Sequence, residues 1–145
     1  MNVLISACLI GVNCRYSGDS SMIEEAEELK NRYHLIPVCP EILGGMTTPR
    51  EPAEKKDGKV ITRTGEDVTK YFERGAKEVL HLAKFYDCKY AILKERSPSC
   101  GRGAIYDGTF SQVIIEGNGI LAELLEKNGI VVLGESQIST FLIQK

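Results

Sequence analysis

Three of the five cysteines in this chain of 145 residues stand at equivalent places in the sequence. Cys8 and Cys39 each directly follow a short apolar run, and Cys100 lies in the loop after a third run. Such runs predict buried strands of a parallel sheet, and the carboxyl ends of parallel strands meet at one edge, where ligands bind. The pattern therefore predicts that three thiols, far apart in the chain, lie together at a ligand site.

The other two cysteines have different positions. Cys14 lies in the loop after the first run and is able to reach the same edge, whereas Cys88 precedes the third run and belongs at the opposite edge. Cysteine is among the residue types most often buried, so packing explains Cys88 and is an open alternative for Cys14. Packing explains Cys8, Cys39 and Cys100 less well, because residues that only fill the core have no reason to occupy three equivalent strand ends.

Thiols gathered at one place favour a metal site or nucleophilic catalysis. A Cys–His pair lacks a suitable base, because His34 begins the second apolar run and His81 is expected to face solvent on a helix. A catalytic zinc ion usually recruits histidine or a close CxxC pair, and the sequence offers neither at this edge. Three thiolates without a fourth obvious ligand suit a [4Fe–4S] cluster with one iron open to a substrate atom.

Two loops at the same expected edge carry further polar groups. The segment 97–103 combines a thiol with Ser97, Ser99 and two glycines, whose exposed N–H groups can hold a thiolate or another anion. A flexible connection is the alternative explanation for that loop. Glu41 follows Cys39 by two residues, which suits acid–base chemistry, and a solvated surface glutamate explains it equally well. The glycines match neither GxGxxG nor a P-loop, so a nucleotide-phosphate site is not indicated.

The elements that would position these residues alternate along the chain. Apolar runs predict strands over 2–7, 35–38, 90–93 and 130–133, and Pro37 favours a sheet edge for the second. Helical periodicity predicts helices beginning near Ser21 (with Glu24 in a capping box), over 67–86 (capped by Asp67), over 119–128, and from Ser136 onward. Hairpins are expected at Asp57-Gly58 and at Asp107-Gly108, the latter between strands 104–106 and 109–111.

This order of elements predicts an α/β, Rossmann-like domain with three layers, spanning residues 1–145. Its mainly parallel sheet has about four core strands, and two small hairpins are inserted into it. The hydrophobic fraction of 43% and the charged fraction of 26% are typical of a soluble globular protein. A net charge of -2 argues against nucleic-acid binding, and no apolar run approaches the ~20 residues of a membrane span. An odd number of cysteines favours the reducing cytoplasm.

Five stretches, taken in order, resemble the thiouracil desulfidase family across nearly the whole chain. They are Ser6-Ala7-Cys8-Leu9 with Gly11 and Cys14-Arg15-Tyr16, Pro37-Val38-Cys39-Pro40-Glu41 with Thr48-Pro49-Arg50-Glu51, Gly65-Glu66-Asp67-Val68-Thr69, Leu93-Lys94-Glu95 with Ser97-Pro98-Ser99-Cys100-Gly101, and Tyr106-Asp107-Gly108-Thr109-Phe110. The ordered combination is more specific than any single motif.

The resemblance implies a [4Fe–4S] enzyme that removes sulfur from bases such as 2-thiouracil, giving uracil and hydrogen sulfide without net redox change. The family's cluster ligands correspond to Cys8, Cys39 and Cys100. Its acidic residue near the cluster corresponds to Glu41, and its serine-containing loop to Ser97 and Ser99. The partner would be a small thiolated pyrimidine, with neither nucleic acid nor membrane.

A second hypothesis is a non-catalytic metal-binding or redox-sensing domain. In that case Cys8, Cys14, Cys39 and Cys100 would be four ligands that close the coordination sphere of structural zinc or of a saturated cluster. The two hypotheses differ in the role of Cys14, which is a ligand only in the second.

Overall fold

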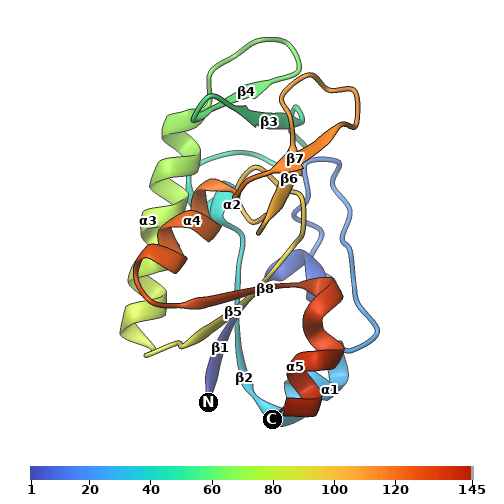
Figure 1. Ribbon diagram of the computed structural model, residues 1–145, viewed down its shortest axis with the longest axis vertical. Helices are drawn as coiled ribbons and strands as arrows, with labels where there is room; N and C mark the ends of the chain where they lie inside the picture. The colour runs from blue at the N-terminus through green and yellow to red at the C-terminus, as the bar shows by residue number, and fades with distance from the viewer. Residues whose placement is uncertain (145) are drawn as a thin grey trace.

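Four parallel strands form the central sheet in the order β2-β1-β5-β8 (Figure 1). Their bounds in the computed structural model are β1 Asn2–Ser6, β2 His34–Val38, β5 Tyr90–Leu93 and β8 Val131–Gly134. The structure describes residues 1–144, with side chains through residue 142. All four predicted core strands are present, and β2, which contains Pro37, lies at a sheet edge as expected. No helix in the described range is long and apolar enough to cross a membrane.

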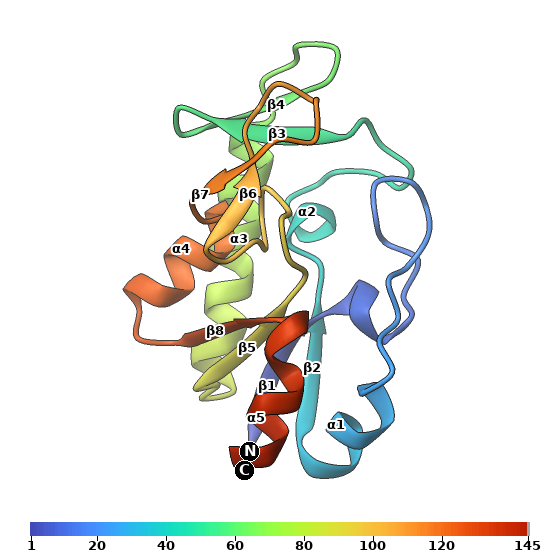
Figure 2. The same cartoon turned by 45° about the vertical axis from the view of Figure 1, so that its right-hand side comes forward.

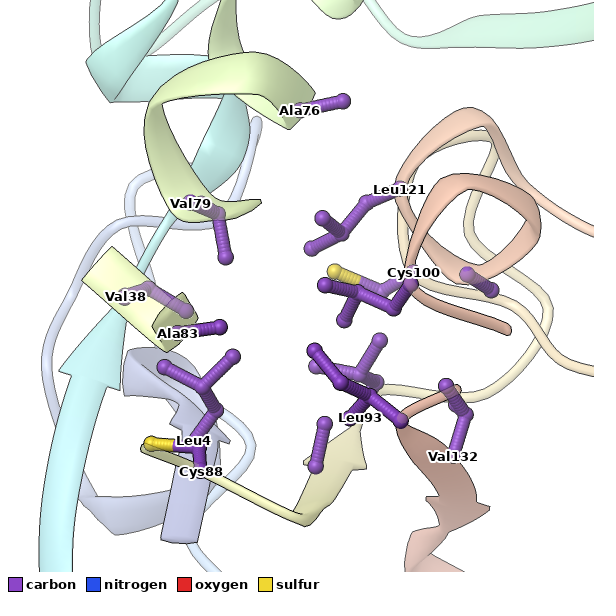
Figure 3. Close-up of a cluster of buried hydrophobic side chains, with 14 residues drawn as sticks. Leu4, Val38, Ala76, Val79, Ala83, Cys88, Leu93, Cys100, Leu121 and Val132 are labelled. Atoms are coloured by element: carbon purple, nitrogen blue, oxygen red, sulfur yellow. The ribbon is translucent and has the colours of Figure 1, made fainter. Parts of the chain in front are cut away.

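Helices cover both faces of this sheet, as the sequence predicts (Figures 1 and 2). They are α1 Ala26–Arg32, α3 Thr69–Phe85, α4 Ile120–Lys127 and α5 Ile138–Gln144. Side chains alternate between the faces along a strand, so Val3 and Ile5 pack with Leu29 of α1 and Ile138 of α5. Leu4 points to the other face, into the cluster that α3 and α4 complete (Figure 3). The sheet is therefore buried between two apolar layers.

The helix ends differ in detail from the predictions. The capping box of Ser21 and Glu24 does not form, and α1 begins later, without a side-chain cap. The Ser21 N–H instead donates to the Cys8 carbonyl at 2.9 Å, and the Ile23 N–H donates to the Leu9 carbonyl at 3.0 Å. These bonds tie the segment to the chain after β1, so a tertiary contact replaces the local cap.

At the start of α3 the cap position belongs to Val68 rather than to the predicted Asp67. The Asp67 carboxylate still accepts the N–H of Thr69, the first helical residue, at 3.0 Å. Hydrogen bonds from the Thr69 hydroxyl and N–H lower the pKa of Asp67. Gly119 and Asn128 flank α4, close to the predicted bounds of that helix.

Two hairpins stand at the end of the molecule away from the N-terminus (Figures 1 and 2). The strands β3 Ala53–Lys56 and β4 Lys59–Thr62 pair around Asp57-Gly58 as predicted. In the second hairpin, β6 Ala104–Tyr106 pairs with β7 Ile114–Glu116. The expected strand at 109–111 is therefore wrong.

The reason lies in how the loop after β6 is held. Asp107 Oδ1 accepts the Thr109 N–H at 2.9 Å, which turns the chain locally. Glu54 Oε1, on β3, accepts the N–H groups of Gly108 and Phe110, each at 3.0 Å. These amides are consequently not available for pairing with β6, and the partner strand starts only at Ile114.

Candidate active site

The carboxyl edge of the sheet borders a cavity of about 340 Å³. Four of the five cysteines line it: Cys8, Cys14, Cys39 and Cys100. Cys8 lies in a short 3-10 helix directly after β1, and Cys39 immediately precedes α2, a short helix over Pro40–Leu43. The predicted convergence of three strand-end thiols is thus observed, and Cys14 joins them.

Cys88 lies outside this site, as predicted. It is buried in the apolar cluster between the sheet and α3, and its N–H donates to the Ala83 carbonyl at 2.8 Å. The two histidines, His34 and His81, are exposed and do not line the cavity.

Two hydroxyl groups lie within hydrogen-bond distance of the Cys100 sulfur. The donor–acceptor distances to Cys100 Sγ are 3.5 Å from Ser6 Oγ and 3.6 Å from Ser99 Oγ. Ser6 Oγ also accepts the Lys94 N–H at 2.9 Å, so it links the end of β1 to the residue after β5. The sequence pattern alone does not assign a role to Ser6. The feature that could have indicated one is a hydroxyl group near the end of an otherwise apolar run.

The two serines of the loop have different contacts. Ser97 Oγ accepts the N–H groups of Ser99 and Cys100, each at 3.1 Å, and thereby folds the loop. Ser99 is 1% exposed, and its hydroxyl lies 2.9 Å from Ser97 Oγ and 2.8 Å from Glu41 Oε2. A hydroxyl has one proton, and the short contact to a carboxylate takes it. Ser99 therefore contacts Glu41, and Ser97 holds the backbone of the loop.

Glu41 is held from its other side by Arg50. Arg50 Nε lies 3.0 Å from Glu41 Oε1, and the two side chains are only 5% and 16% exposed. Arg50 Nη2 donates to the Cys14 carbonyl at 2.9 Å, and Nη1 donates to the Thr47 carbonyl at 3.1 Å. One buried guanidinium thus ties the carboxylate to the Cys14 loop. Glu41 is therefore not a solvated surface glutamate.

The helix that carries Glu41 packs against α3 through two glycines. A Cβ on Gly75 of α3 would stand 1.7 Å from the Pro40 carbonyl oxygen, and one on Gly44 would stand 2.0 Å from the Tyr71 carbonyl oxygen. Real Cβ atoms do not approach backbone so closely, so glycine alone allows this contact. The close packing fixes α2, and with it Glu41, relative to the sheet.

Burial raises the pKa of three thiols at this edge, those of Cys8, Cys14 and Cys100. Burial raises the pKa of Cys8 to about 11, with a further rise from Cys39, while Lys94 and Arg15 act in the opposite direction. Burial likewise raises the pKa of Cys14 to about 12 and that of Cys100 to about 12. A bound cation would offset this cost, because metal ligation requires the thiolate.

The chemistry of these donors fits an iron–sulfur cluster. Among the residues described, no three His, Cys, Asp or Glu side chains gather closely enough to hold one metal ion. The sulfur ligands of one zinc ion all lie about 2.3 Å from it, whereas three cluster thiolates each bind a different iron. Soft thiols placed around a cavity are the donor set that an iron–sulfur cluster uses.

Comparison with known proteins identifies the family of this chain and a solved structure with the same fold. A model of the 2-thiouracil desulfurase family matches residues 3–137. The Bacillus subtilis (strain 168) protein YbbK, described as uncharacterized, is 42% identical over 150 residues, which cover 97% of this chain and 99% of that protein. A solved structure of the [4Fe-4S]-dependent thiouracil desulfidase TudS superposes with a TM-score of 0.93 at 40% identity, covering 99% of this chain and 96% of that one.

Proposed function

Because this chain belongs to the 2-thiouracil desulfurase family, we propose that it is a [4Fe–4S]-dependent desulfidase acting on a thiolated pyrimidine such as 2-thiouracil. Water replaces sulfur at the thiocarbonyl carbon, so that 2-thiouracil and water give uracil and hydrogen sulfide with no electron consumed. The family match and the similarity to TudS support this enzyme over a non-catalytic metal-binding domain. The observation that carries the proposal is a cavity shared by three strand-end thiols and a buried Glu41–Ser99 pair.

Cys8, Cys39 and Cys100 are the proposed cluster ligands, which leaves one iron without a protein ligand. Bound there, the cluster would supply a Lewis-acidic iron for the thiocarbonyl sulfur. The hydroxyl of Ser6 donates a hydrogen bond to Cys100 Sγ, and such a hydrogen bond favours the thiolate form of a cysteine.

Glu41 is the proposed general base. Arg50 and Ser99 each hold one of its oxygens, so the carboxylate is fixed before substrate arrives. It takes a proton from the attacking water. Ser99 Oγ stands between Glu41 Oε2 at 2.8 Å and Cys100 Sγ at 3.6 Å, so its hydroxyl can relay that proton toward the side where sulfur leaves.

The test is anaerobic reconstitution with iron and sulfide, followed by iron counting and measurement of sulfide released from 2-thiouracil. The wild-type protein should bind a cluster and release sulfide. Cys14→Ser should keep both properties, because Cys14 is not a ligand in this proposal. Cluster loss in folded Cys14→Ser, equal to the loss in Cys39→Ser, would favour the four-ligand alternative.

A further inference from the structure

The cavity has a second wall, which the chemistry above does not use. It is formed by the hairpins, and the loop after β6 contributes Phe110 and Gln112 to it. Both residues have left-handed backbone, with φ of 59° and 62°. Such a conformation is unfavourable for side chains of this size and persists where the surroundings impose it, most often at functional sites.

The surroundings that impose it are specific. Glu54 Oε1 on β3 accepts the N–H groups of Gly108 and Phe110, each at 3.0 Å. A Cβ on Gly108 would stand 2.6 Å from Lys56 Cβ, so the loop lies directly on the neighbouring hairpin. One carboxylate thus fixes the residues on both sides of the loop tip and sets where Phe110 stands.

The Phe110 ring is half-buried in the cavity wall. The Arg63 guanidinium lies 5.6 Å from its ring centroid, a cation–π distance, and Arg63 lines the same cavity. An aromatic ring in a cavity wall is a stacking surface for a flat heteroaromatic ligand. We infer that Phe110 is the base-stacking residue of this site and that Glu54 is its positioning residue. This inference rests on the proposed function, because it takes the ligand to be a pyrimidine.

The first test uses the absence of tryptophan from the chain. Phe110→Trp places a single fluorophore in the cavity wall, and Phe85→Trp places one at a site 70% exposed near the end of α3. Both proteins are reconstituted anaerobically and titrated with uracil, a product that does not react. The emission of Phe110→Trp should change saturably, and that of Phe85→Trp should not. Unchanged emission in Phe110→Trp, in protein that releases sulfide from 2-thiouracil, would overturn the inference.

The second test separates binding from chemistry. Phe110→Leu should raise KM for 2-thiouracil about tenfold with kcat nearly unchanged, since stacking is worth about 1–3 kcal/mol per base. Phe110→Tyr should restore the wild-type KM, and iron content should stay normal in all three proteins. A wild-type KM in Phe110→Leu contradicts stacking.

Glu54 is tested through Phe110. Glu54→Ala should raise KM as Phe110→Leu does, and the double variant should be little worse than either one, because both remove the same contact. Additive effects would show that Glu54 acts independently and would overturn its positioning role. If the wild-type protein releases no sulfide, the proposed function fails, while saturable emission changes in Phe110→Trp would still support a base-stacking wall.

Discussion

Two buried cysteines of one apolar cluster, Cys88 and Cys100, are equally shielded from solvent, at 5% exposure each (Figure 3). Their surroundings differ. Cys100 lines the cavity, receives a hydrogen bond from Ser6, and lies beside the Ser99 hydroxyl, 3.6 Å from its sulfur. Cys88 lies at the opposite end of the sheet, where burial and the charge of Asp87 raise its pKa.

The difference shows that burial does not distinguish Cys100, a proposed cluster ligand, from Cys88, a packing cysteine. What distinguishes them is the edge of the sheet on which they lie and the polar groups that the edge gathers. At the carboxyl edge the chain leaves the strands in loops, whose hydroxyls and amides can turn toward a common point. The chain before β5, where Cys88 lies, only completes the apolar core.

The largest effect should come from exchanging each sulfur for oxygen. Cys100→Ser should lose most of its iron after anaerobic reconstitution and release almost no sulfide, because a serine is a poor ligand for a cluster. Cys88→Ser should keep wild-type iron and turnover and lose about 1–3 kcal/mol of stability, because its hydroxyl is buried in an apolar cluster. Iron per chain and thermal melting measure the two outcomes. Iron loss in folded Cys88→Ser would break the comparison.

The position of these cysteines was within reach of sequence analysis. Short apolar runs mark buried strands, and parallel topology places their ends together, so the convergence of Cys8, Cys39 and Cys100 follows from local pattern plus one rule of topology. The same logic placed Cys88 at the other edge.

Residues whose role depends on a distant partner were not found this way. Arg50 lies in a loop, and its importance comes from the Glu41 carboxylate and the Cys14 carbonyl, 36 residues earlier. The loop around Phe110 was predicted as a strand because Asp107-Gly108 is a strong local turn signal. Glu54, on the β3–β4 hairpin, prevents that pairing because its carboxylate accepts the N–H groups of Gly108 and Phe110.

The next effect concerns the polar network of Ser99 and Glu41, which lies beside Cys100 and has no counterpart at Cys88. Glu41→Gln keeps the shape of the side chain and removes the base, so sulfide release should fall by about 10²–10⁴-fold with near-normal iron content. Glu51→Gln, at an exposed position in the same segment, is the matched control and should be unaffected. Full turnover in iron-loaded Glu41→Gln would remove Glu41 from the chemistry. Iron loss would instead make it a ligand or a support for Cys39.

A smaller effect should separate the two loop serines. Ser99→Ala removes a hydrogen bond to the Glu41 carboxylate, worth about 1.5–3 kcal/mol, so turnover should fall about tenfold to a hundredfold with the fold intact. Ser97→Ala removes the acceptor of two loop amides, so it should lower the melting temperature more than Ser99→Ala does. Sulfide release and melting curves of both proteins distinguish a role in turnover from a role in stability. The reverse pattern would assign the relay to Ser97.

The smallest effect should come from Ser6, and it tests the comparison most directly, because Ser6→Ala makes the surroundings of Cys100 more like those of Cys88. The variant leaves the Lys94 N–H without its acceptor and removes the Ser6 hydrogen bond to Cys100 Sγ. Since Ser6 is buried, stability should fall by about 1–3 kcal/mol. Iron should still bind, because Ser6→Ala leaves all the thiols of the cavity in place.

The reduction potential of the cluster is the sharper measurement for this variant. Hydrogen bonds to cluster sulfurs raise the potential, so Ser6→Ala should shift it to more negative values. Ser139→Ala, which changes an exposed serine of α5 outside the cavity, is the control and should leave the potential unchanged. A potential unchanged in Ser6→Ala would mean that its hydroxyl serves only to join β1 to the chain after β5. The position of Cys100 at the carboxyl edge of the sheet, rather than the hydrogen-bond donors around its sulfur, would then be what distinguishes it from Cys88.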